Sequence, residues 1–384
     1  MTMKKQLALL LFPLLLVGCD ALSPYGTSNI PEPTTILDVH PQMHPTIAWQ
    51  EDVGYGSRGS YLRLAPCIQN NVVYNVDLLG VMYATSAQGN HLWKKKFKVP
   101  GKSDLAGSDN QLAFVDAQAT LHVVNAAQEG KEIWHATLSD QALAAPTFTA
   151  DKIFVKTIDG SVTAFNRATG EQLWQYQHAV STLMLRASSP VSVVGNVGYV
   201  GFSDGKVVAL NLATGDEIWS QQAAEAKGFS EIERLIDIDA NLIVKGQRLY
   251  VATYQGDVSA LDVHTGKILW QQPSSVYADI TLDNDLLYAI AADGTMTAYN
   301  ANNGKIVWTN KTFAWHFLTG PTLFENNLVM GDEEGHVYFV NPKTGTLLGQ
   351  TKPYKDSKII SHPLVLGQEV IVVDTLGELS AITL

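Results

Sequence analysis

The sequence has 384 residues, with 37 Asp and Glu against 26 Lys and Arg, which gives a formal net charge of −11. An acidic protein repels nucleic-acid phosphates, and no basic stripe overrides this repulsion, so we expect no nucleic-acid partner. The length would allow two or three ordinary domains, which makes internal repeats the first pattern to look for.

The first 18 residues have the pattern of a secretory signal. Lys4 and Lys5 form a basic region, and the apolar run over residues 7–17 is too short for a lasting membrane span. The run leads to Gly18 and Cys19, which resembles the lipobox of bacterial lipoproteins. This resemblance implies cleavage before Cys19, acylation of that cysteine and a lipid-anchored protein. The alternative is an ordinary signal peptide with a chance cysteine.

Residues 19–45 are expected to be a lipidated cysteine followed by a flexible tether. The segment contains five prolines with Ser, Thr and Asn between them, a composition that cannot bury a core. Acylation of Cys19 would leave Cys67 as the single free cysteine, so an intrachain disulfide is impossible. Cys67 lies in an apolar stretch after Pro66, and we interpret it as a buried, unreactive thiol.

The rest of the chain consists of copies of one repeat. A typical copy begins at Ile158-Asp159-Gly160 and ends at Thr169-Gly170 and Trp174. The repeat tryptophans are 38 to 51 residues apart, at Trp93, Trp134, Trp174, Trp219, Trp270 and Trp308. This period and the short alternating strands within it are typical of four-stranded β-propeller blades. In the blade that ends at Trp219, the expected strands cover residues 190–194, 197–202, 206–210 and 217–220.

The last copy, which begins at Leu376-Gly377, lacks its fourth strand. Thr46 to Gln50, directly after the tether, resembles the missing strand and contains Trp49. The sequence therefore predicts an all-β domain over residues 46–384, an eight-bladed β-propeller of four-stranded antiparallel blades. The N-terminal strand would complete the C-terminal blade and close the ring. Gly349 stands where other blades carry tryptophan, and we expect a less well packed seam there.

Two recurring features of the repeat have structural explanations. The tryptophans, at one per blade, are expected to pack between neighbouring blades. An Asn or Asp precedes the last turn of each typical copy, where its side chain can accept hydrogen bonds from turn amides. These turn residues are Asn166, Asn211, Asp262, Asn300 and Asn341.

The repeat period is longest around two consecutive connections between blades, which must be neighbours on one face of a propeller. The first connection carries Leu183, Leu185 and Arg186, and the second carries Asp237 and Asp239. Apolar anchors beside one guanidinium and two carboxylates have the composition of a binding hot spot with a polar rim. The alternative is that the leucines fold back onto the propeller while Arg186 pairs internally with one of the aspartates. The residues alone leave both possibilities open.

The Thr-Gly-x-x-x-Trp repeats also resemble the quinoprotein alcohol dehydrogenases, which bind pyrroloquinoline quinone and calcium at the propeller axis. That resemblance would imply calcium ligands, a catalytic aspartate and a disulfide of adjacent cysteines, but Cys67 has no cysteine beside it. Only His40 and His44, in the tether, have a metal-ligand spacing. Asp332-Glu333-Glu334 resembles a solvated hairpin tip. We therefore expect no catalysis, no metal and no cofactor.

Four features together resemble the BamB family. They are the lipobox, the eight blades, the Leu-x-Leu-Arg segment at 183–186 followed by Ser-Pro, and the Arg-Leu-x-Asp-x-Asp segment at 234–239. The resemblance covers the whole mature chain and implies a non-catalytic scaffold of the outer-membrane β-barrel assembly complex. It also implies docking on a periplasmic POTRA domain of BamA, the barrel subunit, with the partner-binding residues Leu183, Leu185, Arg186, Asp237 and Asp239.

Two departures from the family pattern affect these expectations. Ala187 replaces the glycine usual after the arginine, which changes the turn that the loop can make. Asp20 directly follows Cys19, and in enteric bacteria an aspartate there tends to retain lipoproteins at the inner membrane rather than the outer membrane. A different binding mode is capture of unfolded outer-membrane proteins by strand addition to the outer blade edges. Trp315, between Phe313 and Phe317, would then supply an aromatic contact or simply pack between blades.

Overall fold

Short runs of apolar residues between tight turns fold into β-strands along almost the whole chain. The computed structural model describes residues 31–36, 41–180, 189–225, 229–230 and 232–384. Residues 33–384 make up one unit, in which the strands are arranged in four-stranded antiparallel sheets. A 3-10 turn, η1 (Ala126–Gln128), lies between the last two strands of one sheet. Among the described residues, no helix has the length and apolar character needed to cross a membrane.

The sheets are numbered here as blades 1 to 8 in chain order. Blade 1 consists of β2 (Cys67–Gln69), β3 (Val72–Val76), β4 (Val81–Ser86) and β5 (His91–Lys96). Blade 2 consists of β6 (Ala106–Ser108), β7 (Gln111–Val115), β8 (Thr120–Asn125) and β9 (Lys131–Thr137). Blade 3 consists of β10 (Thr147–Phe148), β11 (Lys152–Lys156), β12 (Ser161–Asn166) and β13 (Gln172–Gln177). Blade 4 consists of β14 (Ser192–Val194), β15 (Val197–Gly201), β16 (Lys206–Asn211) and β17 (Glu217–Gln222).

The second half of the ring follows the same plan. Blade 5 consists of β18 (Ile243–Lys245), β19 (Arg248–Ala252), β20 (Gly256–Asp262) and β21 (Ile268–Ser274). Blade 6 consists of β22 (Thr281–Asp283), β23 (Leu286–Ile290), β24 (Met296–Asn300) and β25 (Ile306–Asn310). Blade 7 consists of β26 (Thr322–Phe324), β27 (Asn327–Gly331), β28 (Val337–Val340) and β29 (Leu347–Thr351). Blade 8 consists of β30 (Leu364–Leu366), β31 (Glu369–Val373), β32 (Glu378–Thr383) and β1 (Thr46–Asp52).

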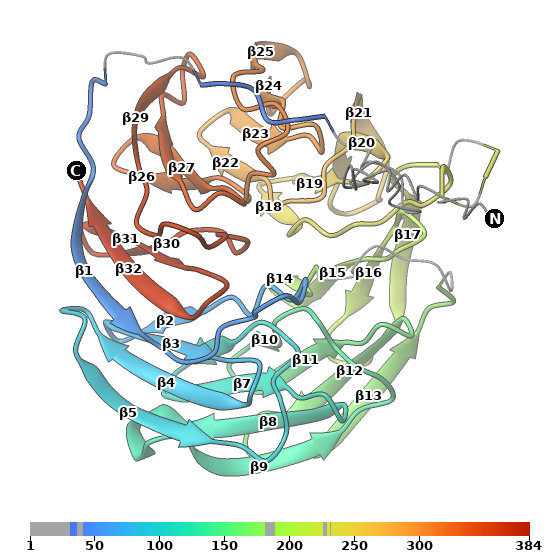
Figure 1. Cartoon of the computed structure of the whole chain (residues 1–384). Coiled ribbons are helices and arrows are strands. Elements are labelled where there is room, and N and C mark those ends of the chain that lie inside the picture. The colour runs from blue at the N-terminus through green and yellow to red at the C-terminus, as the bar shows by residue number, and fades with distance from the viewer. Residues whose placement is uncertain (1–30, 37–40, 181–188, 226–228, 231) are drawn as a thin grey trace, which may run out of the picture. The chain divides into compact units, whose positions relative to one another are not determined.

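Blade 8 closes the ring with strands from the two ends of the sequence. Strand β1 pairs with β32 from Thr46 opposite Thr383 to Asp52 opposite Glu378, with one irregularity between Ile47 and Trp49. Figure 1 shows this junction as the blue β1 beside the red β32. The expected eight-bladed fold and its closure by the N-terminal strand are confirmed.

Over the part of the chain that the structure describes, the core consists of eight apolar clusters, one in each seam between neighbouring blades. In seven seams a tryptophan from a fourth strand lies on a glycine in the last turn of the next blade. Trp134 is typical, because a Cβ on Gly170 would approach its ring to 2.6 Å, and the indole N–H donates to the Arg167 carbonyl at 2.9 Å. The full set of pairs is Trp49–Gly89, Trp93–Gly130, Trp134–Gly170, Trp174–Gly215, Trp219–Gly266, Trp270–Gly304 and Trp308–Gly345. The expected packing of the tryptophans between blades is confirmed.

The turn chemistry expected from the repeat is also confirmed. Asn166 Oδ1 accepts the backbone N–H groups of Ala168 at 2.9 Å and Thr169 at 3.1 Å. The equivalent side chains accept turn amides in the later blades, at Asn211, Asp262, Asn300 and Asn341.

The seam between blades 7 and 8 is built differently. Gly349 is in strand β29, and the apolar cluster of this seam contains Met43 in place of a tryptophan. Met43 belongs to the segment before β1, whose Gln42 and Met43 N–H groups donate to the Leu348 carbonyl at 2.8 and 3.0 Å. The end of the expected tether therefore lies against blade 7.

Candidate functional site

The connections from the fourth strand of one blade to the first strand of the next all emerge on one face, called here the connecting face. The two long connections join β13 to β14 and β17 to β18, and the first strands β14 and β18 contact each other. The strands that these two connections enter are therefore neighbours. Leu183, Leu185 and Arg186 of the first connection lie outside the described residues, as does the lipobox Cys19.

Asp237 and Asp239 lie inside the protein, each with 0 % exposure. Between them, Ile238 is equally buried and fills the space above Gly201, where a Cβ would approach Ile238 Cγ2 to 2.3 Å. The Asp237 carbonyl also accepts the N–H of Tyr254 at 2.8 Å. This segment of the second connection is thus fixed into the inner part of blades 4 and 5, with its carboxylates shielded from solvent.

Lys156 is a buried cation close to these two aspartates. It is the last residue of β11 in blade 3, is 4 % exposed, and donates from Nζ to the Gly201 carbonyl at 2.9 Å. Burial lowers the pKa of Lys156 to about 8, although the charges of Asp237 and Asp239 oppose the shift. Lys156 therefore joins blade 3 electrostatically to the connection between blades 4 and 5.

The repeat contains the signal that could have identified Lys156. The last residue of the second strand is apolar or glycine in the other seven blades, so a lysine there departs from the pattern. The equivalent residues are Val76, Val115, Gly201, Ala252, Ile290, Gly331 and Val373.

A second charged cluster joins three connections of the connecting face. Asp279 lies 3.2 Å from His362 Nδ1 and 3.9 Å from Arg63 Nη1, and these residues come from three different connections. Burial alone would raise the pKa of Asp279, but the bonds and charges of His362 and Arg63 lower it to about 2. Asp279 in turn raises the pKa of His362 against the opposing effect of burial. Arg63 also donates to the Tyr277 carbonyl at 3.0 Å.

The space beside this cluster is small. Arg63, Asp279, Phe317 and His362 are among the residues that line a cavity of about 30 Å³. A water molecule needs roughly 10–15 Å³ of such space, whereas pockets for organic ligands measure roughly 300–1,000 Å³. The cavity is therefore large enough for water but too small for a quinone cofactor.

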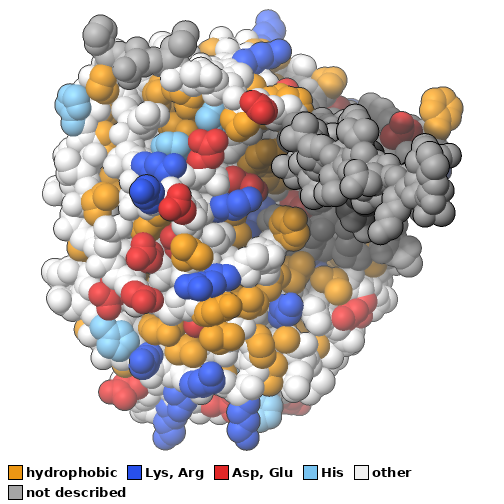
Figure 2. Space-filling model, viewed as in Figure 1, with side chains coloured by type: hydrophobic (Ala, Val, Ile, Leu, Met, Phe, Trp, Pro, Cys, Tyr) orange, Lys and Arg blue, Asp and Glu red, His pale blue; other side chains and the backbone are white. Residues whose placement is uncertain are grey.

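The connecting face also presents large apolar side chains to solvent. In the second long connection, Phe229 is fully exposed and Ile232 is 72 % exposed, and Tyr61 in the connection before blade 1 is 82 % exposed. Exposed side chains of this size are the kind that become buried in protein interfaces. Figure 2 shows a face on which acidic, basic and apolar side chains are interspersed.

The aromatic cluster in the connection before blade 7 is divided between core and surface. Phe313 is 0 % exposed and belongs to the apolar cluster between blades 6 and 7, whereas Trp315 and Phe317 are half-buried. Trp315 has a left-handed backbone with φ of 65°. The cluster is therefore mainly a packing element.

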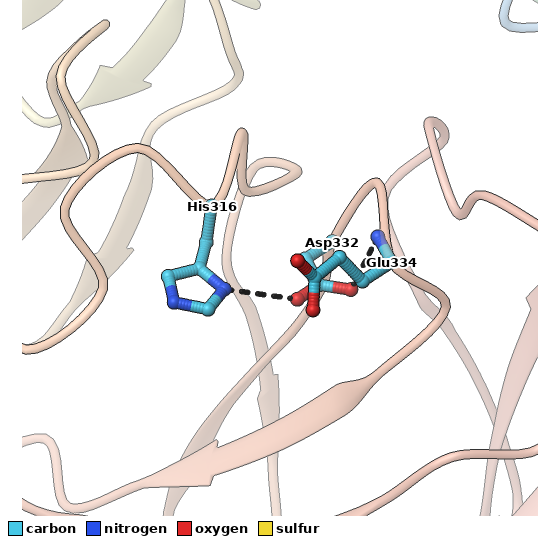
Figure 3. Close-up of side chains that lie close together, drawn as sticks. All are labelled: His316, Asp332 and Glu334. Atoms are coloured by element: carbon cyan, nitrogen blue, oxygen red, sulfur yellow. Dashed lines mark hydrogen bonds and ion pairs between the residues drawn. The ribbon is translucent and has the colours of Figure 1, made fainter. Parts of the chain in front are cut away.

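Figure 3 shows a group of possible metal ligands: His316, Asp332 and Glu334. The expectation of a solvated tip at 332–334 is wrong for Asp332, which is 0 % exposed. Asp332 is buried because several donors satisfy it: the Tyr338 hydroxyl at 2.7 Å, His316 Nδ1 at 3.3 Å and His336 Nδ1 at 3.2 Å all reach Oδ2. Hydrogen bonds thus account for this carboxylate, and the group has the character of an internal polar network.

The sequence profile of the family described as outer membrane protein assembly factor BamB matches residues 79–310 and 292–384. The chain belongs to the BamB family. A BamB from Legionella pneumophila is 33 % identical over 388 residues, covering 99 % of this chain and 100 % of the relative. A BamB from Shewanella oneidensis is 27 % identical, covering 94 % of this chain and 95 % of the relative.

Solved structures agree on the fold. The crystal structure of BamB from Moraxella catarrhalis superposes with a TM-score of 0.81 at 20 % identity, covering 89 % of this chain and 100 % of that one. The quinohemoprotein alcohol dehydrogenase from Comamonas testosteroni superposes with a TM-score of 0.70 at 13 % identity, covering 88 % of this chain and 76 % of that one. These likenesses concern the propeller alone, whereas membership of the BamB family rests on sequence over nearly the full chain.

Proposed function

We propose that this member of the BamB family is a non-catalytic binding subunit of the machinery that assembles β-barrel proteins in the outer membrane. The lipobox supports cleavage before Cys19 and acylation of that residue, with the propeller on the periplasmic face of the membrane. Family membership supports the outer membrane as its location, and Asp20 is the feature of the sequence that favours inner-membrane retention.

We further propose that the connecting face docks on a periplasmic POTRA domain of BamA. The observation that carries this proposal is the exposure of Phe229 and Ile232 directly before the buried segment 237–239. Leu183, Leu185 and Arg186, on the neighbouring connection, would complete the apolar anchor and supply its charge. Asp237 and Asp239 would hold this connection in place from inside the protein and would not touch the partner, because their carboxylates are shielded from solvent.

A quinone-dependent enzyme is the alternative from another functional class. The cavity of about 30 Å³ at Arg63 and Asp279 gives it no support, because the described side chains leave no room there for the cofactor. The charged side chains that line this cavity are also paired with one another, as His362 is with Asp279. We therefore derive no chemistry for this position.

A second binding mode has its own supporting observation. The residue before the blade tryptophan is an exposed aliphatic side chain, between 41 and 51 % exposed, on six fourth strands. These residues are Leu92, Ile133, Leu173, Ile218, Leu269 and Val307. Outer strands with exposed apolar side chains suit an unfolded outer-membrane protein that adds as a further strand.

Site-specific photocrosslinking in living cells separates the two modes. A photoreactive phenylalanine analogue would replace Phe229 or Ile232 on the connecting face, and Ile218 or Val307 on outer strands. We expect a single large adduct containing a barrel protein with periplasmic domains from positions 229 and 232, and none from the outer strands. Adducts from 218 and 307 alone would instead support strand addition.

Two further outcomes would count against a Bam subunit altogether. One is the absence of any adduct with a barrel protein at all four positions, in cells where the protein is folded and lipidated. The other is a dye-linked dehydrogenase activity of the purified full chain after addition of pyrroloquinoline quinone and calcium.

A further inference from the structure

The segment expected to be a free tether is docked on the propeller in two places. In the first, the Thr34 N–H donates to the Ala314 carbonyl at 3.0 Å and its hydroxyl donates to the Thr312 carbonyl at 2.6 Å. Ile36 packs against the apolar cluster between blades 6 and 7. In the second, Met43 is held against blade 7 at Leu348. The segment therefore has a specific bound conformation at both of these places.

His316 connects the first docking place to the buried carboxylate of blade 7. Its Nε2 lies 2.8 Å from the Thr34 carbonyl, its Nδ1 lies 3.3 Å from Asp332 Oδ2, and the side chain is 5 % exposed. A carbonyl and a carboxylate can only accept hydrogen bonds, so each ring nitrogen must carry a hydrogen to satisfy both. An imidazolium at His316 satisfies both acceptors at once.

The charged groups around His316 favour this state. Burial alone would lower the pKa of His316, but the Asp332 carboxylate, the Thr34 carbonyl and the charge of Glu334 raise it. Asp332 itself is held well below its usual pKa by His316 and His336, against the effect of burial.

The remaining groups that face His316 do not compete for its protons. Tyr338 stands at right angles to the His316 ring, with centroids 6.1 Å apart, and its hydroxyl donates to Asp332. Glu333 donates its backbone N–H to the His316 carbonyl at 3.5 Å, while its carboxylate pairs with Lys358. His336 shares Asp332 with His316, and within the described residues its ring pairs with Asp332 and Glu334.

We propose that His316 is an imidazolium clamp that fixes the chain's own N-terminal linker to blades 6 and 7 through the Thr34 carbonyl. The clamp sets the point at which the linker leaves the propeller at residue 33 instead of residue 42, where the second docking place begins. If Cys19 is the lipid anchor, a consequence that rests on the proposed function, the free linker shortens from about 80 Å to about 50 Å at full extension. The clamp itself requires neither the anchor nor a partner.

The clamp has a defined pH dependence. A histidine whose pKa is raised in the folded protein stabilises the bound state fully below its ordinary pKa and loses this effect as the pH rises through the raised value. The linker should therefore stay docked through neutral pH and be released under alkaline conditions.

Hydrogen exchange of the full-length chain in detergent tests the clamp at the Thr34 amide, which is protected only while it donates to Ala314. In His316→Gln, we expect this amide to exchange about tenfold faster or more at neutral pH, because a charged hydrogen bond is lost. His336→Gln is the matched control, since that histidine also contacts Asp332, and Thr34 should stay protected. Unchanged protection of Thr34 in His316→Gln would overturn the proposal.

A second measurement keeps the test decisive if His316→Gln folds poorly. The ring nitrogens of His316 in the wild-type chain should both carry a hydrogen at neutral pH in nitrogen NMR spectra. Thr34→Pro removes the donor to Ala314 and should shift the titration of His316 to lower pH. A neutral ring at pH 7 in the wild type would contradict the clamp. Neither readout involves BamA, so its result is independent of the photocrosslinking experiment.

Discussion

Met43 lies so close to Gly349 that a Cβ on residue 349 would approach the Met43 carbonyl to 2.6 Å. The topology explains this contact. Each blade tryptophan needs a glycine turn between the third and fourth strands of the next blade, but in blade 8 those strands, β32 and β1, are more than 300 residues apart in sequence. A tryptophan at 349 would have no such turn to lie on. The segment entering β1 passes there instead, and Met43 fills the seam.

The first prediction concerns this seam. Met43 is only half-buried, so Met43→Ala should lower the free energy of unfolding by about 1–2 kcal/mol, less than for a fully buried methionine. Hydrogen exchange should become faster in β29 while β17 is unaffected. His44→Ala, an exposed neighbour, is the control and should change neither quantity. Equal exchange in β29 of the Met43 variant and the wild type would contradict the role of Met43.

The second prediction concerns ring closure. Deletion of residues 46–53 should expose the edge of β32 and cause aggregation or a large fall in melting temperature, because an open edge can pair with other chains. Deletion of residues 22–30 should leave the melting temperature unchanged. If both truncated proteins melted like the full chain, β1 would not be needed for closure.

The third prediction concerns acid stability. The pKa of Asp279 is about 2 in the folded protein against an ordinary value of 3.8, so its ionised form contributes about 2 kcal/mol above pH 4. This contribution should disappear as the pH falls through 2. In acid unfolding followed by circular dichroism, Asp279→Asn should be less stable than the wild type at pH 5, and the difference should shrink towards pH 2. A constant difference between pH 5 and pH 2 would show that the Asp279 charge is not responsible.

The fourth prediction concerns capture of the barrel subunit. Arg186→Ala should weaken binding by about 2 kcal/mol or more, and Leu183→Ala and Leu185→Ala should act similarly, as expected for anchor residues. Lys94→Ala, an exposed residue on β5, should have little effect. Melting temperatures of the variants distinguish the two roles that the sequence leaves open for Arg186, a contact with the partner or an internal ion pair. Lost capture with a normal melting temperature supports a direct contact, whereas lost capture together with unfolding supports an internal ion pair.

Much of the fold could be predicted because it depends on residues that recur. Thr-Gly turns and tryptophans at regular spacing indicated the blades, and the expected strands of blade 4 differ from the observed ones by two residues or fewer at each end. Thr46 to Gln50 was recognisable as a fourth strand because it carries Trp49 in the repeat position. Local pattern and tertiary packing agree at these positions.

The site was less predictable because its groups meet only in three dimensions. Lys156 comes from blade 3 and Asp239 from the connection before blade 5, and no local pattern relates them. The aspartates at 237 and 239 were expected beside a surface hot spot, yet the need to seat Ile238 above Gly201 places them inside. Asp332 looked solvated because its neighbours in sequence are acidic, while its partner His316 lies in the preceding connection.

The junction in blade 8 also dictates an order of events during folding. Strand β1 leaves the ribosome long before β32, its only neighbour in the blade, has been made. Contacts between residues this distant in sequence form late and slowly, because a large loop must close first. For most of its synthesis the chain therefore carries a ready strand without a place to pair. Closure of the ring is therefore the last step of folding, and it waits until the whole chain is available.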